Sequence, residues 1–439
     1  MDDQPVSADP DLLATIDLGR EQADRRRVAK EELDEAIADI QGLLGHEGFL
    51  GASGFATAVT ASANVPLIYI AASLRGGTAL LVHGPVVLPV DLPLLTEEEV
   101  SVLVADYANA KTEWQRNRTV GLAQWRESLD RVCRRLWEVV VEPIRAVVGP
   151  ARAVLIPCGP LGLVPLHAAW APVAGSDRRR YLLDDMTISY APSAHALLAA
   201  QQVRDATPGH RLLAVVEPAP VSAVALPLAS CEVSAAVGAS TDPLVRCGED
   251  ATVDELERLL PHVDVLHFAG HCHSNVHRPV SSGLILANDK RLTLARVLEI
   301  PMRLRLAILS ACDSGVFGER MPDEVIALPT GLLQAGAAGV VAGLWALEDG
   351  SAAMVLAEFH RVWRREYSEP ADALRAAQRW LRDTTNGEKA AIYEAASTVD
   401  GWLAAEAADA LYARVAWEDP DERSHAHIDS WAGMVFVGV

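Results

Sequence analysis

Short apolar runs alternate with amphipathic stretches along most of the chain, and this alternation predicts an α/β protein. In the second half, buried strands are predicted at HRLLAVVEP, VDVLHFAG, LRLAILSA and AGVVAGLW. Apolar residues at helical spacing follow these runs, over residues 231–237, 252–260, 328–334 and 351–364. Strands that alternate with helices form parallel sheets with right-handed crossovers. The run SWAGMVFVGV predicts a final buried strand.

The first half predicts a second α/β unit. Residues 64–92 carry β-rich runs bounded by glycine and proline, which predict a small antiparallel meander. Apolar residues then recur three and four apart over residues 96–148, which predicts a long helical segment. ARAVLIP and RYLLDDMTISYAPS predict two more strands, and a helix is predicted over residues 193–206.

These patterns divide the chain into three parts. Residues 1–59 form an N-terminal segment, in which amphipathic helices are predicted between Asp9 and Leu44. Residues 60–206 form the first α/β unit, and residues 207–439 form the second. The apolar stripe of the N-terminal helices must pack either on the rest of the chain or on a partner.

Composition narrows the class of protein. Half of the residues are hydrophobic and the net charge is −21, which is typical of a globular protein and disfavours nucleic-acid binding. The six cysteines form no CxxC pair and the chain opens acidic, so we expect a cytoplasmic protein. The 34 arginines against four lysines indicate a high-GC bacterial gene. Two apolar stretches are long enough to be compared with membrane spans. Prolines break residues 153–175, and glycines divide residues 327–347 into a predicted helix, a turn and a buried strand.

Two residues with reactive side chains follow predicted strands. His271 comes directly after VDVLHFAG, and Cys312 comes directly after LRLAILSA. Functional side chains of open α/β sheets collect past the carboxyl ends of parallel strands, where a histidine and a cysteine can pair as base and thiolate nucleophile. A single cysteine in an apolar run can equally be a small hydrophobic core residue.

The motifs around these residues carry a family resemblance. LHFAGH, SGLILAND, LAILSACDSG, LPTGLLQAGAAGVVAGLWALED and HAHIDSWAGMVFVGV occur in this order, and the whole resemblance covers about Pro66–Val439. They resemble the CHAT domain, a family of caspase-like cysteine peptidases related to separase and the caspases. The resemblance implies a three-layer αβα fold with a mainly parallel sheet, in which residues 60–206 are a pseudo-caspase-like half and residues 207–439 are the catalytic half.

The resemblance also implies roles for individual residues. His271 would be the general base, and Cys312 would be the nucleophile that forms a thioester. Backbone N–H groups of Cys312 and Cys272 would hold the oxyanion, although relatives generally have glycine at the position of Cys272. Asp349 would read a basic substrate side chain, with Glu348 as the second candidate. Either acid could instead cap the helix that follows.

Other acidic residues lie near the predicted dyad in the sequence and would favour a basic peptide: Asp313, Glu319 and Asp323. A competing interpretation is metal binding by the histidines around Cys272, namely His267, His271, His273 and His277. No second ligand cluster completes such a site, so we expect neither metal nor cofactor. His425 and His427 resemble the family's histidine before the last strand and are interpreted as structural.

The sequence has no GxxxxGK loop, no GxSxG elbow and no GxGxxG after a strand, which excludes P-loop NTPases, serine hydrolases and dinucleotide enzymes. Two functions remain. The first is a cysteine endopeptidase that cleaves a protein or peptide substrate after a basic residue, in regulated proteolysis such as bacterial defence or cell death. An activating protein partner is expected, whereas nucleic acid and membrane are not. The second is an inactive pseudo-peptidase that acts as a protein-interaction module.

Overall fold

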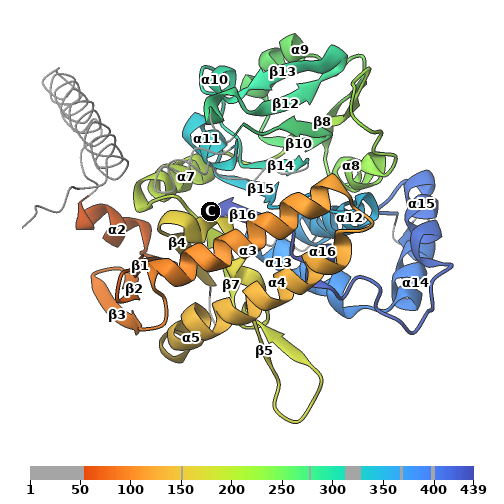
Figure 1. The fold of residues 1–439 in the computed structure, drawn as a ribbon. Helices are drawn as coiled ribbons and strands as arrows, with labels where there is room; N and C mark the ends of the chain where they lie inside the picture. Colours follow the sequence, from red (N-terminus) through yellow and green to blue (C-terminus); the bar gives the residue numbers. More distant parts are fainter. Residues whose placement is uncertain (1–53, 150–151, 276–277, 312–327, 366–368, 397–400) are drawn as a thin grey trace, which may run out of the picture. The chain divides into compact units, whose positions relative to one another are not determined.

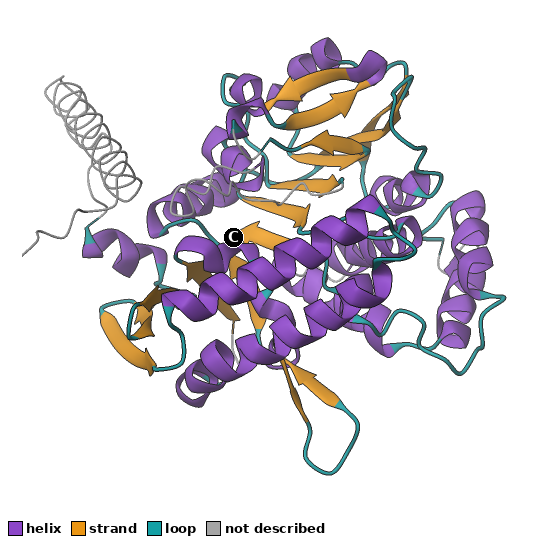
Figure 2. Ribbon diagram, in the orientation of Figure 1, coloured by secondary structure: helices purple, strands orange, loops and turns teal. Residues whose placement is uncertain are grey.

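A computed structural model describes residues 54–149, 152–275, 278–311, 328–365, 369–396 and 401–439. The amphipathic helices expected between Asp9 and Leu44 lie outside these residues. Residues 55–439 form one compact unit, and an 11-stranded sheet runs through it (Figures 1 and 2). The sheet continues across the expected boundary at residue 206, so the two predicted units share it.

The strand order of this sheet is β3-β2-β1-β4-β7-β16-β15-β14-β10-β8-β9. The strands are β1 (Leu67–Ser73), β2 (Gly76–His83), β3 (Val86–Leu92), β4 (Arg152–Pro157), β7 (Thr187–Tyr190), β8 (Arg211–Pro218), β9 (Asp242–Gly248), β10 (Val265–Ala269), β14 (Leu306–Ser310), β15 (Gly339–Gly343) and β16 (Met434–Gly438). The predicted meander is confirmed as β1–β3, although β1 also pairs with β4 in the main sheet.

The sheet contains two parallel blocks that run in opposite directions. Strands β1, β4, β7 and β16 are parallel to one another, and so are β15, β14, β10, β8 and β9. The blocks meet where β16 pairs antiparallel with β15, with Val341 opposite Phe436. The C-terminal run therefore lies in the middle of the sheet, where all five residues of β16 are buried.

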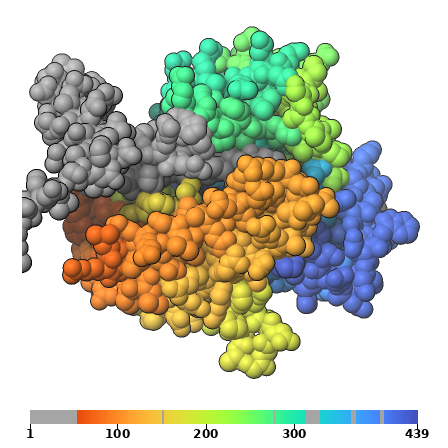
Figure 3. All heavy atoms as spheres, viewed as in Figure 1, coloured from red at the N-terminus to blue at the C-terminus, as the bar shows by residue number. Residues whose placement is uncertain are grey.

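Helices cover both faces of the sheet because its side chains alternate. On β1, Leu67 packs with α2 (Phe55–Ala61) and α7 (Ala194–Ala206), whereas Ile68 and Ile70 belong to the larger core on the other face. That second face is covered by α3 (Glu97–Arg116), α4 (Leu122–Leu136) and α5 (Glu142–Val148), which form the orange layer in Figure 3. These layers and the mainly parallel sheet confirm the predicted α/β class.

The prediction of one long helical segment over residues 96–148 is wrong in one respect, because the chain turns back between α3 and α4. Thr96 caps α3 by accepting a hydrogen bond from the N–H of Glu99. A Cβ atom at Gly121 would lie 2.6 Å from Cα of Trp114, so glycine is required where α4 starts against α3. Trp125 of α4 then stacks on Trp114, with ring centroids 5.4 Å apart.

The C-terminal block carries the remaining elements. The predicted helices are present as α8 (Ala229–Gly238), α9 (Val253–Leu259), α11 (Leu328–Ala335) and α12 (Asp349–Arg365), and the short helix α10 (Leu294–Val297) precedes β14. In the described residues that follow, the helices are α13 (Pro370–Asp383), α14 (Asn386–Ala396), α15 (Ala405–Val415) and α16 (Ile428–Trp431). A separate antiparallel sheet contains β11 (His271–His273), β12 (Gly283–Leu286) and β13 (Lys290–Thr293). The motif SGLILAND therefore contains a strand, β12, that lies outside the main sheet.

Candidate active site

The carboxyl ends of β10 and β14 lie side by side in the C-terminal block. Their register places Ala269 opposite Ser310, and the N–H of Gly270 donates to the carbonyl of Ser310 at 3.1 Å. A Cβ atom at Gly270 would lie 2.9 Å from Cζ of Phe268, so a glycine is needed where the chain leaves the main sheet. His271 then opens β11. The strand that leads to His271 is thus the neighbour of the strand that leads to Cys312.

The imidazole of His271 is oriented by a backbone carbonyl. Its Nε2 lies 2.8 Å from the carbonyl oxygen of Val224, in the loop before α8. A carbonyl can only accept, so Nε2 carries the proton and, in the neutral ring, Nδ1 is the basic nitrogen. This tautomer is suited to taking a proton from a thiol. Cys312 lies outside the described residues, as do Asp313, Glu319 and Asp323.

Cys272 fits the backbone without strain. It pairs with Leu284 in the β11–β12 ladder and is half-buried. Cys272 is not among the described non-glycine residues with positive φ, which are Glu217, Asn288 and Asp289. A side chain at this position therefore needs no left-handed conformation. Its role in holding an oxyanion stays a prediction.

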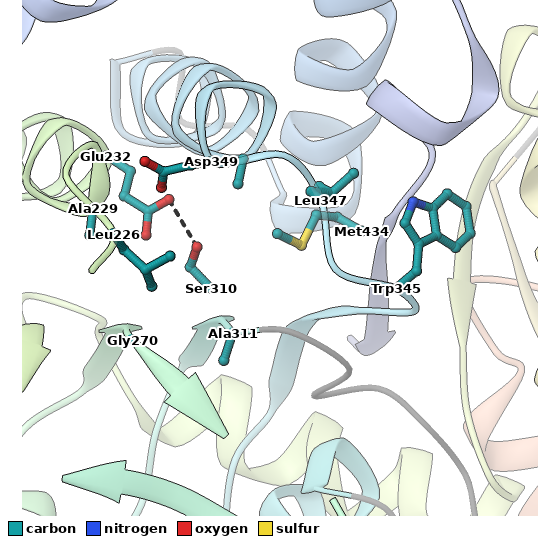
Figure 4. Close-up of a pocket in the computed structure, with 11 residues that line it drawn as sticks. Leu226, Ala229, Glu232, Gly270, Ser310, Ala311, Trp345, Leu347, Asp349 and Met434 are labelled. Carbon is teal, nitrogen blue, oxygen red and sulfur yellow. Dashed lines mark hydrogen bonds between the residues drawn. The ribbon is translucent and has the colours of Figure 1, made fainter. Parts of the chain in front are cut away.

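A pocket adjoins the two strand ends (Figure 4). Its described lining comes from the loop before α8, from α8, from the ends of β10 and β14, and from the segment between β15 and α12. The residues are Leu226, Ala229, Glu232, Gly270, Ser310, Ala311, Trp345, Leu347, Asp349, Ala352 and Met434. It holds about 430 Å³ of empty space, with open solvent at its mouth included. One end is acidic, and the other is apolar.

The two acids that follow β15 face different sides. Trp345, Leu347 and Asp349 line the pocket, whereas Ala346 and Glu348 line a neighbouring hollow. Glu348 accepts a hydrogen bond from the N–H of Ser351 at 3.0 Å, which caps α12, and it also pairs with Arg414.

Asp349 is held by the loop before α8. Its Oδ2 accepts a hydrogen bond from the N–H of Leu228 at 3.1 Å. Burial raises the pKa of Asp349, and the charge of Glu348 adds to this effect. The same loop thus holds Asp349 through Leu228 and His271 through Val224.

Sequence reasoning missed a second acid in the pocket. Glu232 lies on α8 and is only 2% exposed. Its Oε2 accepts a hydrogen bond from Oγ of Ser310 at 2.9 Å, and its Oε1 lies 3.2 Å from Nε2 of His267. Burial raises the pKa of Glu232. The sequence held one signal for this acid. An acidic residue on the apolar side of a short alanine-rich helix must find polar partners inside the protein.

Most of the sequence matches a known family. Residues 130–439 match the sequence profile of the CHAT domain, which is well over half of the chain. The chain belongs to the CHAT domain family. No curated protein matches this CHAT protein.

Solved structures show what the CHAT fold is similar to. Two crystal structures of the Saccharomyces cerevisiae separase–securin complex align with a TM-score of 0.54 at 9% identity, over 87% of this chain and 30% of the other. The CHAT protein thus spans less than a third of that chain. The Arg-specific cysteine proteinase gingipain R aligns at 10% identity over 71% of this chain and 67% of the other, with a TM-score of 0.39. The likeness to separase supports a caspase-like fold.

Other histidines of the CHAT protein have separate environments. His267 lies in the main sheet, while His271 and His273 lie in the small sheet, and His277 is outside the described residues. Within the described ranges, no group of three or more His, Cys, Asp or Glu side chains is placed to hold a metal ion. Burial lowers the pKa of His425 to about 4. His427 precedes α16 and is exposed.

None of the helices in the described segments of the CHAT protein combines the length and apolar character needed to cross a membrane.

Proposed function

We propose that this CHAT protein is a cysteine endopeptidase with a His271–Cys312 dyad that cleaves protein substrates after a basic residue. The observation that carries the proposal is the orientation of His271. Its Nε2 is engaged by the carbonyl of Val224 while the neighbouring strand end leads to Cys312. The adjoining acidic pocket, with Asp349 in its wall, supports a cationic side chain as the residue before the cleaved bond.

The proposed reaction has two steps. Nδ1 of His271 takes the proton of the Cys312 thiol, and the thiolate attacks the scissile carbonyl carbon. The C–N bond then breaks, the leaving amine takes the proton from His271, and a thioester remains. Water activated by His271 hydrolyses the thioester, which releases the acid and restores the thiol. Backbone N–H groups of Cys272 and Cys312 would stabilise the oxyanion in both steps.

Cys312 labelling and peptide cleavage test this proposal. The full chain is treated with an iodoacetamide-alkyne probe, and the labelling rate of Cys312 is compared with those of the exposed thiols Cys158 and Cys247. We expect Cys312 to react faster, and we expect His271→Gln to remove this difference. Cleavage of candidate proteins encoded by neighbouring genes should be lost in Cys312→Ala. The neighbours are included because an activating partner is part of the proposal.

The alternative function has its own signature in this test. If Cys312 reacts no faster than Cys247 and the Cys312→Ala variant changes no cleavage, the peptidase proposal is refuted. An inactive interaction module would then be the better description. Association with signalling, such as bacterial defence or programmed cell death, is part of our proposal and rests on the family resemblance alone.

A further inference from the structure

The acidic end of the pocket contains two carboxylates. Figure 4 shows Glu232 and Asp349 near each other, with Ser310 below Glu232. Among the described lining residues there is no arginine, lysine or histidine. Burial raises the pKa of both carboxyls, and the charge of Asp349 adds to this effect at Glu232. The pocket is therefore electrostatically prepared for a positively charged group.

A line of buried polar groups stands behind Glu232. His267 of β10 lies between Glu232 and His360 of α12, and its Nδ1 is 2.8 Å from Nε2 of His360. The two imidazole rings stack, with centroids 5.0 Å apart. Glu232, His267 and His360 are all at most 2% exposed. These bonds fix the carboxylate to three elements of the fold, so its position is set before any ligand arrives.

The hydrogen bonds to Glu232 do not use all of the accepting capacity of its carboxylate. Its Oε1 is bonded to His267 and its Oε2 to Ser310, yet each carboxylate oxygen can accept about two hydrogen bonds. Both oxygens therefore keep accepting capacity. Ser310 is the last residue of β14, which places this capacity at the strand end beside Gly270.

This geometry suits a guanidinium group. A guanidinium group presents five N–H donors in a planar fork and can bond two carboxylates at once, whereas an ammonium group is a compact charge with three donors. We propose that Glu232 is a second specificity residue of this pocket, which together with Asp349 selects an arginine side chain over a lysine side chain. This inference rests on the proposed peptidase function and extends it to a residue that the family resemblance did not indicate.

A purely structural role for Glu232 makes a different prediction. If the carboxylate only ties α8 to β10 and β14, its loss should lower stability and weaken every ligand to the same extent. If it reads the ligand, its loss should weaken cationic ligands alone and change the ratio between arginine and lysine. Selectivity among ligands therefore separates the two roles.

The experiment measures binding, so it does not depend on cleavage. Isothermal titration calorimetry on the full chain carrying Cys312→Ala uses Nα-acetyl-arginine amide, Nα-acetyl-lysine amide and Nα-acetyl-norleucine amide. Glu232→Gln keeps the shape of the side chain and removes its charge. We expect it to weaken the arginine ligand by about tenfold or more, because a charge-assisted hydrogen bond is lost. The arginine-to-lysine ratio should fall, and binding of the norleucine ligand should stay the same.

Two further variants complete the design. Glu348→Gln is the matched control, because Glu348 faces the neighbouring hollow, and it should leave the arginine-to-lysine ratio unchanged. Ser310→Ala serves as the test if Glu232→Gln does not fold. It removes one hydrogen bond to Glu232 and keeps the charge of Glu232, so it should reduce arginine binding by about threefold. Thermal melting of each variant reports folding.

The outcomes are distinguishable from failure of the proposed function. An unchanged arginine-to-lysine ratio in Glu232→Gln, or equal loss of all three ligands, overturns this inference even if the wild type cleaves after arginine. Absence of arginine binding in the parent protein overturns it as well. Selective arginine binding that requires Glu232 supports it even if Cys312 shows no peptidase activity.

Discussion

Asp349 offers the most direct test of whether the pocket binds a positively charged side chain. The substitution Asp349→Asn removes the negative charge with little change in shape. The side-chain oxygen of asparagine can still accept from the N–H of Leu228, so the bond that ties the start of α12 to the loop before α8 is retained. The variant therefore isolates the contribution of the carboxylate to substrate binding.

The magnitude follows from the interaction that is lost. A hydrogen bond between a guanidinium group and a carboxylate contributes about 1.5–3 kcal/mol, more than a neutral one. At about 1.4 kcal/mol per factor of ten, this corresponds to a loss of roughly 10- to 150-fold in kcat/KM for an arginine peptide. A methionine peptide has no charge to lose, so its kcat/KM should not fall.

The assay compares fluorogenic peptides that differ only in the residue before the cleaved bond. The labelling rate of Cys312 by iodoacetamide is measured in parallel and should be unchanged, since the dyad is intact. Glu348→Gln is the control, because it loses a surface pair with Arg414 worth at most about 1 kcal/mol and does not line the pocket. Undiminished arginine turnover in Asp349→Asn would refute our assignment, and so would a larger effect of Glu348→Gln.

Three further predictions concern the strand ends and the buried acid. Burial raises the pKa of Glu232 above its value in the unfolded chain, so the folded state binds the proton more tightly. The free energy of unfolding should therefore fall as pH rises through the folded pKa, by at most about 1.4 kcal/mol per pH unit. Urea unfolding of Glu232→Gln should lack this decline, and an identical slope in both proteins would contradict the cause. Gly270→Ala should lower the free energy of unfolding in urea by about 1–3 kcal/mol and slow the labelling of Cys312, because the new Cβ would lie 2.9 Å from Phe268. Wild-type stability of this variant would show that the contact is easily relieved. Cys272→Gly should keep or raise cleavage, since position 272 has ordinary strand geometry, and complete loss of cleavage would show that the thiol itself is required.

The fold was largely predictable where apolar runs were unambiguous. VDVLHFAG and LRLAILSA correspond to β10 and β14, whose residues are almost all buried on both faces and so read as continuous hydrophobic segments. The edge strand β9 was not predicted, because it is only partly buried and its sequence DPLVRCG shows little contrast. The turn between α3 and α4 was missed although the sequence there is polar and contains Asn117 and Gly121, and the packing of Gly121 against Trp114 is a tertiary contact.

The candidate site was predictable only in part. His271 and Asp349 could be proposed as site residues because each follows a strand and fits a family motif. Glu232, Ser310 and His360 come from three distant segments, and no spacing in the sequence connects them. Their association is a consequence of strand order, since β10 lies between β8 and β14 while α8 and α12 pack together.

The position of β16 has a consequence for biosynthesis. This strand joins the two blocks of the sheet by pairing with β7 on one side and β15 on the other. A ribosome makes β16 after every other strand of the sheet. Before that, a nascent chain has two separate blocks of strands, in which β7 and β15 still lack β16 as a partner. The sheet that supports the candidate site is therefore completed only after β16 has left the exit tunnel, and a partly translated chain cannot hold that site in its final form.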